Sequence, residues 1–272
     1  MAIPEERFTD AMFRRFADVI YQRFGIVYKE EKREMLRAKI SRHMRREGMD
    51  SYEEFFNLLL HRDSRDLWMA FVDDITIHTT NFFRERNHFD YIRRHIDDIF
   101  EANPRILGRR ELRAWSSAAS TGEEPYTLAM VLAEALGDRA SFKILATDVS
   151  RGALAQGMAG EYRVDIRQDV EPLYLQKYFV RTSRGFMVTP ELRHRVVFRL
   201  FNLADPFPFR HPLDMIFCRN VMIYFSAEMQ QELVDKVYRA LAPGGLFFIG
   251  HSESLIGKRH RFKYIQPTVY MR

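Results

Sequence analysis

The stretch Ala-Trp-Ser-Ser-Ala-Ala-Ser-Thr-Gly-Glu-Glu-Pro-Tyr, residues 114–126, decides the fold. It passes from a β-like run through a loop of small residues into an acidic helix start, as at the first strand of an open α/β sheet. Small side chains let a ligand approach the loop backbone closely. Only Gly122 is glycine here, so the loop is not the G-x-G-x-x-G of dinucleotide sites. A plain tight turn is the alternative interpretation.

Carboxylates follow both of the first two predicted strands. Glu123 and Glu124 open the helix after the loop, where they interact favourably with the helix dipole but would repel a pyrophosphate. Either one could hold an ammonium group, which favours a cofactor with an amino-acid part over NAD. Asp148 ends the second predicted strand, a position where doubly wound folds bind ribose hydroxyls. A strand-end Asp is otherwise a common helix N-cap. Asp148 therefore indicates a cofactor site more strongly when it is combined with the loop after the first strand than by itself.

From Pro104 onward, short β-rich runs alternate with helical stretches, which predicts an α/β fold with a mostly parallel sheet wrapped by helices. We expect strands at 112–116, 143–147, 196–200, 213–218 and 246–250, a closing run at 262–271, and helices at 123–136, 150–157 and 226–241. A small hairpin at 179–189 interrupts the alternation.

Residues 8 to about 100 show helical periodicity instead. We expect helices from Thr9 to Gly25, at about 31–47, from the Ser51 capping box onward, and at about 64–78 and 85–101. The predicted domains are therefore an all-helical one at 1–80 and an α/β one at 81–272, with a small β insertion at about 175–195.

Composition and charge narrow the class of protein. The chain has 272 residues, 46% hydrophobic and 29% charged, which is typical of a globular protein. No apolar run approaches the roughly 20 residues of a membrane span and no signal pattern opens the chain, so we expect a cytoplasmic protein. The single cysteine, Cys218, excludes an internal disulfide and a cysteine-rich metal site. Residues 29–46 hold eight Lys or Arg and three Glu, which equals the whole chain's +5 and indicates a localised acidic partner.

Four separated motifs resemble those of the CheR receptor methyltransferases: FFRE at 82–85, SSAASTGEEPY at 116–126, IFCRNVMIYF at 216–225 and GHSE at 250–253. They occur in the family's order, and the helical N-terminal region matches as well, so the resemblance covers nearly the whole chain. It implies a helical receptor-docking domain followed by a Rossmann-like methyltransferase domain. The implied activity is S-adenosyl-L-methionine-dependent esterification of glutamate side chains on methyl-accepting chemotaxis receptors, which sets sensory adaptation.

The resemblance also implies the cofactor contacts. Glu124 would hold the methionine ammonium of S-adenosyl-L-methionine, and Asp148 its ribose hydroxyls. The other implied contacts are Asn202 and Leu203 at the adenine, Asn220 and Val221 at the ribose or methionyl part, and Thr80, Arg84 and His78 toward the methionine end. His78 departs from the family, because many members have Asn there, although an imidazole can still donate one hydrogen bond.

Arg84 and Tyr224 are implied to lie nearest the transferred methyl group and are our catalytic candidates. A glutamate carboxylate, with a pKa of about 4.3, is already ionised at neutral pH, so no general base is required. The enzyme must align carboxylate, methyl and sulfur, exclude water, and release S-adenosyl-L-homocysteine. Arg84 suits alignment because a guanidinium pairs directionally with a carboxylate. Without the family motif, Arg84 would be interpreted as a surface ion pair and Tyr224 as a core aromatic.

The predicted partner is the cytoplasmic helical bundle of the receptors. Lys32, Lys39, Arg42 and Arg46 share one flank of the second helix, and the resemblance implies that this flank docks on Glu- and Gln-rich receptor helices. A solvated helix face is the alternative. The hairpin lacks the extra glycine-bearing stretch of tethering family members, so we expect no pentapeptide tether. We further expect a monomer, associated with membrane receptor arrays through protein contacts.

Two other classes of protein, nucleic-acid methyltransferases and non-catalytic cofactor-binding regulators, share some of these sequence features. A nucleic-acid methyltransferase would also combine a basic patch with a cofactor domain. Residues 220–224 are not of the Asn/Asp-Pro-Pro-Tyr type, however, and the basic helix lacks interleaved aromatics, so we expect no nucleic acid partner. Arg84 and Tyr224 argue against a cofactor-binding regulator without catalysis. His251, Ser252 and Glu253 lack a nucleophile elbow, and no H-E-x-x-H spacing predicts a metal.

Overall fold

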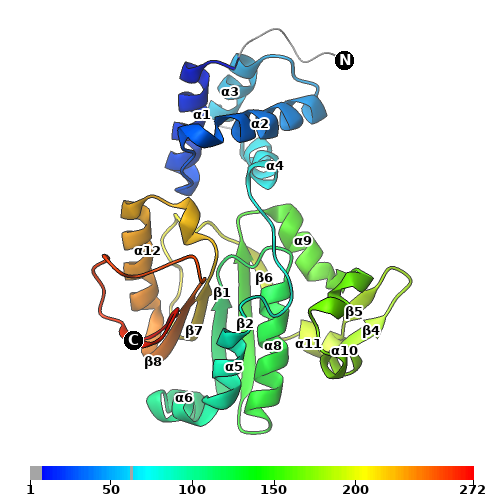
Figure 1. Ribbon diagram of the computed structural model, residues 1–272, viewed down its shortest axis with the longest axis vertical. Helices are drawn as coiled ribbons and strands as arrows, with labels where there is room; N and C mark the ends of the chain where they lie inside the picture. The colour runs from blue at the N-terminus through cyan, green and yellow to red at the C-terminus, as the bar shows by residue number, and fades with distance from the viewer. Residues whose placement is uncertain (1–7, 62–63) are drawn as a thin grey trace.

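The computed structural model describes residues 8–61 and 64–272. A small helical domain stands above a larger α/β domain, and an extended connection leads from one to the other after Ile75 (Figure 1). The helical domain has a core of its own, built from buried side chains between Phe8 and Ile75. Among the described residues, no helix combines the length and the apolar character needed to cross a bilayer.

The helical domain contains α1 (Asp10–Phe24), η1 (Glu30–Lys32), α2 (Arg33–Glu47), α3 (Tyr52–Leu60) and α4 (Arg65–Ile75). The predicted caps are confirmed: Thr9 Oγ1 accepts the N–H of Met12 at 3.2 Å, and Gly25 ends α1 with a left-handed φ of 71°. The second helix begins with a 3-10 turn, so its α-helical part starts later than expected. The fourth helix stops at Ile75 rather than at 78, because the chain becomes extended there to enter the α/β domain.

The single helix expected at 85–101 is wrong. The chain forms α5 (Asn87–Arg94), α6 (Ile96–Ala102) and a short α7 (Arg105–Arg109). His95, with φ −117° and ψ 26°, is not helical and separates α5 from α6. The break has a packing reason, because α5 lies against α8 while α6 lies against β8. A straight helix could not bury its apolar face against both elements.

The main sheet has seven strands in the order β6-β2-β1-β7-β8-β10-β9. The five parallel strands are β1 (Glu111–Ser116), β2 (Ser141–Asp148), β6 (Val196–Leu200), β7 (Leu213–Cys218) and β8 (Leu241–Ile249). The predicted mostly parallel sheet is thus confirmed. The closing run is not one strand but an antiparallel pair, β9 (Lys263–Gln266) and β10 (Val269–Met271). The fifth expected strand starts earlier, at Leu241, and includes Pro243 and both glycines after it.

Helices cover both faces of the sheet because its central strands are apolar on both sides. In β7, Met215 and Phe217 join the core under α5, α6 and α8 (Glu123–Leu136), whereas Ile216 and Cys218 join the core under α12 (Ala227–Ala240). Figure 1 shows α8 and α12 on opposite sides of the strands. A further helix, α9 (Arg151–Ala159), follows β2 and touches α4 of the helical domain.

The predicted hairpin is present as β4 (Phe179–Arg181) and β5 (Phe186–Val188). A two-residue strand, β3 (Glu161–Tyr162), adds to it, so the insertion has a three-stranded sheet that draws in earlier residues than the expected 175. The remaining insertion elements are η2 (Val164–Gln168), α10 (Pro172–Tyr178) and α11 (Pro190–Arg193). In Figure 1 the insertion lies beside α8, away from the helical domain.

Candidate active site

A cleft lies between the helical domain and the carboxyl ends of β1, β2 and β7. Both domains line it, and its volume is about 1200 Å³ when the part open to solvent is counted. The predicted site residues in its wall are Lys32, His78, Thr80, Arg84, Glu124, Asp148, Asn202, Leu203, Asn220, Val221 and Tyr224. The tertiary structure therefore brings all predicted cofactor positions to one cavity, although they span about half of the chain.

The loop of residues 117–122 forms the floor of the cleft next to β1. The N–H of Ser117 donates to Phe217 O and that of Ala119 to Thr147 O, so the loop is fixed to both neighbouring strands. Ser117, Ala118 and Ser120 face the cleft. Gly122 does not: a Cβ there would lie 2.7 Å from the Tyr162 hydroxyl oxygen. Its smallness therefore serves packing against the insertion, not ligand approach as the sequence suggested.

Asp148 sits at the tip of β2 with its carboxylate buried. One carboxylate oxygen accepts the N–H of Ser120 at 2.8 Å, and the other accepts the N–H of Ser150 at 3.0 Å. Burial raises the pKa of Asp148 despite these two hydrogen bonds. Each carboxylate oxygen retains acceptor capacity, which matches a ligand with a pair of hydroxyl donors.

Glu124 lies at the start of α8 with 14% of its side-chain surface exposed. Its Oε1 accepts the Ser116 hydroxyl at 2.7 Å, and its Oε2 lies 3.4 Å from Nη1 of Arg219. Burial raises the pKa of Glu124, and Arg219 opposes that rise. Arg219 is shared, because its Nη2 also donates to Glu85 at 3.0 Å. A ligand ammonium would thus meet a carboxylate that is only partly neutralised.

Arg84 and Tyr224 face the same cleft from different elements. Arg84 lies on the connection between the domains, where its Nη1 donates to Thr79 O at 2.8 Å. Tyr224 ends η3 (Met222–Tyr224), and its carbonyl accepts the N–H of Val27 at 2.8 Å. Burial raises the pKa of Tyr224, whereas the nearby Arg84 charge lowers it. The helical domain therefore helps to hold Tyr224, a contribution that the sequence did not indicate.

Two predicted contact residues have side chains already bound to the protein. The Nδ2 of Asn202 donates to Arg23 O at 2.7 Å, and its Oδ1 accepts the N–H of Ala204 at 3.0 Å. His78 shares a hydrogen bond of 2.8 Å with the Thr76 hydroxyl through Nε2. Its carbonyl accepts the hydroxyl of Ser120. Both residues fasten the cleft wall, and the Asn202 amide keeps further donor and acceptor capacity for a ligand.

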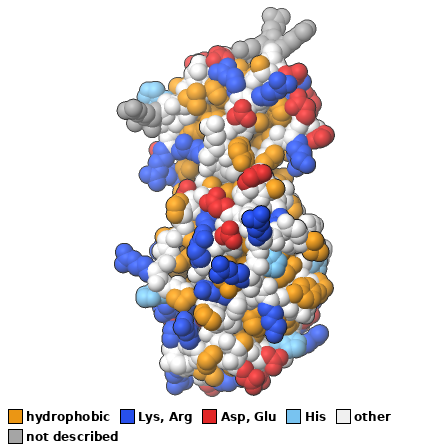
Figure 2. All heavy atoms as spheres, turned by 90° about the vertical axis from the view of Figure 1, so that its left-hand side faces the viewer, with side chains coloured by type: hydrophobic (Ala, Val, Ile, Leu, Met, Phe, Trp, Pro, Cys, Tyr) orange, Lys and Arg blue, Asp and Glu red, His pale blue; other side chains and the backbone are white. Residues whose placement is uncertain are grey.

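The four docking candidates are not equivalent. Lys32 lies in η1 rather than on α2 with the other three, and its Nζ is 5.8 Å from the centre of the Tyr224 ring. Lys39 is half-buried, and its Nζ donates to Ile75 O at 2.7 Å and to Thr76 O at 3.2 Å, at the end of α4. Burial, together with Arg42, lowers the pKa of Lys39. Arg46 pairs with Asp74 at 2.9 Å. Arg42 is exposed and makes no hydrogen bond or ion pair within the described part of the chain. Figure 2 shows basic side chains on the α/β domain as well as on the helical domain.

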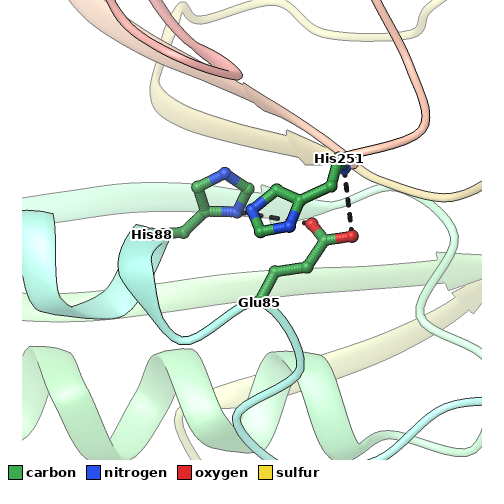
Figure 3. A group of neighbouring side chains, drawn as sticks. All are labelled: Glu85, His88 and His251. Atoms are coloured by element: carbon green, nitrogen blue, oxygen red, sulfur yellow. Dashed lines mark hydrogen bonds and ion pairs between the residues drawn. The ribbon is translucent and has the colours of Figure 1, made fainter.

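Glu85, His88 and His251 form a cluster beside the cleft whose potential ligand atoms lie within 4.8 Å of one another (Figure 3). Glu85 Oε1 accepts the N–H of His251 at 3.0 Å, and Oε2 accepts the guanidinium of Arg219. Burial lowers the pKa of His88 to about 3, so its imidazole is neutral. The guanidinium of Arg219 provides positive charge at the Glu85 carboxylate, and Nδ1 of His88 lies 3.8 Å from Glu85 Oε2.

Three charged residues around the cleft had no role from the sequence: the buried Arg219 and Glu253, and the partly buried Glu85. Each stands inside a motif that carried the family resemblance, so motif membership was the available signal. What the motifs could not indicate was that Glu85 pairs with Arg219, 134 residues later, and that the Glu253 carboxylate binds the backbone directly after Arg219.

Comparison with known proteins adds independent evidence. Residues 78–271 match the family model described as "CheR methyltransferase, SAM binding domain", and residues 11–76 match "CheR methyltransferase, all-alpha domain". The chemotaxis protein methyltransferase of Escherichia coli (strain K12) is 39% identical over 96% of this chain and 91% of its own length. Chemotaxis protein methyltransferase 2 of Pseudomonas aeruginosa is 36% identical over 98% of this chain and 94% of its own. The Borreliella burgdorferi chemotaxis protein methyltransferase is 34% identical over 94% and 92%.

Proposed function

The chain belongs to the CheR methyltransferase family, and from that premise we propose that it methylates glutamate side chains of methyl-accepting chemotaxis receptors. It is an S-adenosylmethionine-dependent methyltransferase with an all-helical domain and a cofactor-binding domain, as both family matches state. The observation that carries the proposal is the cleft itself. It combines two carboxylates for a cofactor, Glu124 and Asp148, with a cation and a phenol, Arg84 and Tyr224, for the acceptor.

The cofactor roles rest on the chemistry of the donor set. Asp148 has acceptor capacity for two ribose hydroxyls, and Glu124 has a partly neutralised carboxylate suited to an ammonium. Asn202 and Leu203 would flank the adenine. Asn220 and Val221 would contact the ribose or methionyl part, and Thr80 with His78 the methionine end. Bound S-adenosyl-L-methionine supplies an activated methyl group on a sulfonium.

The protein's own contribution to methyl transfer is positioning. An acceptor glutamate is ionised at neutral pH, so it needs no general base to accept the methyl group that the bound cofactor would supply. Arg84 would orient the acceptor carboxylate through its planar guanidinium, and Tyr224 would orient either reactant through its hydroxyl. The helical domain covers the cleft and would exclude water from the reacting atoms. The products are a methyl ester and S-adenosyl-L-homocysteine.

The acceptor would approach along the basic flank of α2. Arg42 has no ion-pair partner among the described residues and Lys32 is exposed beside the Tyr224 ring, whereas Lys39 and Arg46 direct part of their charge to groups within the domain. Such complementarity chiefly speeds encounter and weakens as salt rises. We further propose that the protein acts as a monomer in the cytoplasm, reaches receptor arrays through these protein contacts, and binds no receptor pentapeptide through its compact insertion.

Two measurements test this proposal. Calorimetric titration of the wild-type chain with S-adenosyl-L-homocysteine should show micromolar or tighter binding, and Asp148→Ala should abolish it. Methyl-labelled cofactor incubated with a receptor cytoplasmic fragment should then yield protein-bound label that mild alkali releases as methanol, the behaviour of a carboxyl methyl ester. Absence of cofactor binding by folded wild-type protein would refute the cofactor roles. Alkali-stable label would refute glutamate as the acceptor.

A further inference from the structure

The carboxylate of Glu253 lies behind the cleft and gathers four backbone N–H groups. Its Oε1 accepts from Val221 at 2.9 Å and from Met222 at 2.7 Å. Its Oε2 accepts from Asn220 at 2.9 Å and from Gly250 at 2.5 Å. Glu253 is buried, with 8% of its surface exposed, and it is not part of the cleft wall. It therefore acts on the loop, not on a ligand.

The loop after β7 needs such an acceptor. The strand ends at Cys218, and Asn220 then adopts a left-handed φ of 57°, so three successive N–H groups leave the ladder without a strand partner. Buried N–H groups without acceptors are strongly unfavourable. One carboxylate satisfies all three and, by also binding Gly250, ties the end of β7 to the end of β8. No side chain fits at Gly250, because a Cβ there would lie 2.5 Å from Nδ2 of Asn220.

A second carboxylate holds the same loop through Asn220. The Asn220 side chain donates to Glu85 Oε1 at 3.0 Å, while its backbone N–H binds Glu253. Glu85 follows Arg84 on the interdomain connection and itself has a left-handed φ of 56°. Such a conformation persists only where surrounding contacts enforce it. Glu85 and Glu253 thus fix Arg84 and the 220–224 loop relative to each other.

We propose that Glu253 is a positioning residue for methyl transfer, which holds the 220–224 loop so that Asn220, Val221 and Tyr224 face the cofactor and acceptor. This inference rests on the proposed function, because it assigns those three residues to that reaction. Only an acceptor-only group satisfies the site, since all four partners are N–H donors. An amide in place of the carboxylate would turn an NH₂ group toward one pair of those donors.

The test compares Glu253→Gln with Asp214→Asn. Asp214 is a buried carboxylate at the opposite end of β7, where it accepts the N–H of Arg113 at 2.8 Å and Nδ2 of Asn103 at 2.7 Å. Both substitutions are isosteric and should lower the thermal midpoint. Only Glu253→Gln should weaken S-adenosyl-L-homocysteine binding and lower kcat, each by about tenfold or more, because only its loop carries site residues. Equal losses of S-adenosyl-L-homocysteine affinity and of kcat in the two variants would overturn the inference.

A double-mutant cycle separates positioning from simple destabilisation. If Glu253 acts through Tyr224, Glu253→Gln should cost much less kcat in a Tyr224→Phe background than in the wild type. Full additivity would contradict action through Tyr224. Should Glu253→Gln fail to fold, Glu253→Asp keeps the acceptor chemistry with a shorter reach, and the same readouts should show a smaller loss. A wild type without cofactor binding refutes the proposed function, whereas an active wild type with a wild-type-like Glu253→Gln refutes only this inference.

Discussion

The two ends of β7 both contain buried charge, but they balance it differently. At the amino end, the single carboxylate of Asp214 is matched by the guanidinium of Arg109 and by hydrogen bonds from Asn103 and Arg113. At the carboxyl end, the buried guanidinium of Arg219 pairs with the carboxylates of Glu85 and Glu124, and Asp148 is a further carboxylate in the cleft wall. The amino end is neutral and structural. The carboxyl end opens on the cleft, where Glu124 and Asp148 stand among Lys32, Arg84 and Arg219 and are available to a ligand with ammonium and hydroxyl donors.

Among substitutions at the two ends of β7, we expect the largest loss of kcat at Arg84, which lines the cleft. Arg84→Lys keeps the charge but loses the planar fork, so we expect kcat to fall by about 100-fold from lost acceptor alignment. Arg86→Lys is the matched control, because Arg86 pairs with Glu171 outside the cleft and should leave kcat nearly unchanged. Steady-state methylation of a receptor fragment measures both. Equal kcat values for the two variants would remove Arg84 from the reaction.

Substitutions at Glu124 and Asp214 should separate an effect on ligand affinity from an effect on protein stability. Glu124→Gln removes the proposed ammonium partner, so we expect the Kd for S-adenosyl-L-homocysteine to rise by roughly 10- to 100-fold. Because burial disfavours ionised Glu124, the neutral amide should leave stability unchanged or raise it. Asp214→Asn should do the reverse, with an unchanged Kd and a loss of about 1–3 kcal/mol in unfolding free energy. Calorimetry and thermal melts on both variants decide between these patterns.

The pH dependence of cofactor affinity tests the two carboxylates in the cleft wall, Glu124 and Asp148. Burial raises the pKa of both Glu124 and Asp148 above their ordinary values. Ligand binding needs the ionised forms, so the Kd for S-adenosyl-L-homocysteine should be flat at high pH and rise as the pH falls through the raised pKa values. The loss should therefore begin at a higher pH than for ordinary carboxyl groups. In Glu124→Gln the pH dependence should become shallower, and an unchanged profile would mean that Glu124 does not titrate in binding.

We expect the smallest effect, a change in the KM for receptor, at Arg42 on α2. Arg42→Glu should raise the KM for receptor by about three- to tenfold at low salt, and less at high salt, without changing cofactor affinity. Arg105→Glu, an exposed site on α7 with the same charge change, should have little effect on that KM. If both variants raise KM alike, net charge governs encounter and the α2 flank has no special role.

Local patterns in the sequence were sufficient for most of the fold. Thr9 and Gly25 predicted both ends of α1, because a cap acts on the nearest turn of its own helix. The observed β7, β6 and α8 have the predicted bounds, because their apolar periodicity is continuous and their ends carry turn residues. The break at His95 escaped prediction, since it depends on α5 and α6 facing different partners. The split of the closing run likewise depends on pairing with β8.

For the site, the sequence alone determined the class of protein and which residues were candidates, because its motifs are contiguous and specific. Only the tertiary structure decided how those residues work together. Lys39 and Asn202 proved to be fastened to backbone carbonyls, and Glu253 proved to organise a loop more than 30 residues before it. Hydrogen bonds and burial of this kind join positions that are distant along the chain. The physical reason is that a buried group's charge and partners are set by everything packed around it, and a linear motif does not contain that information.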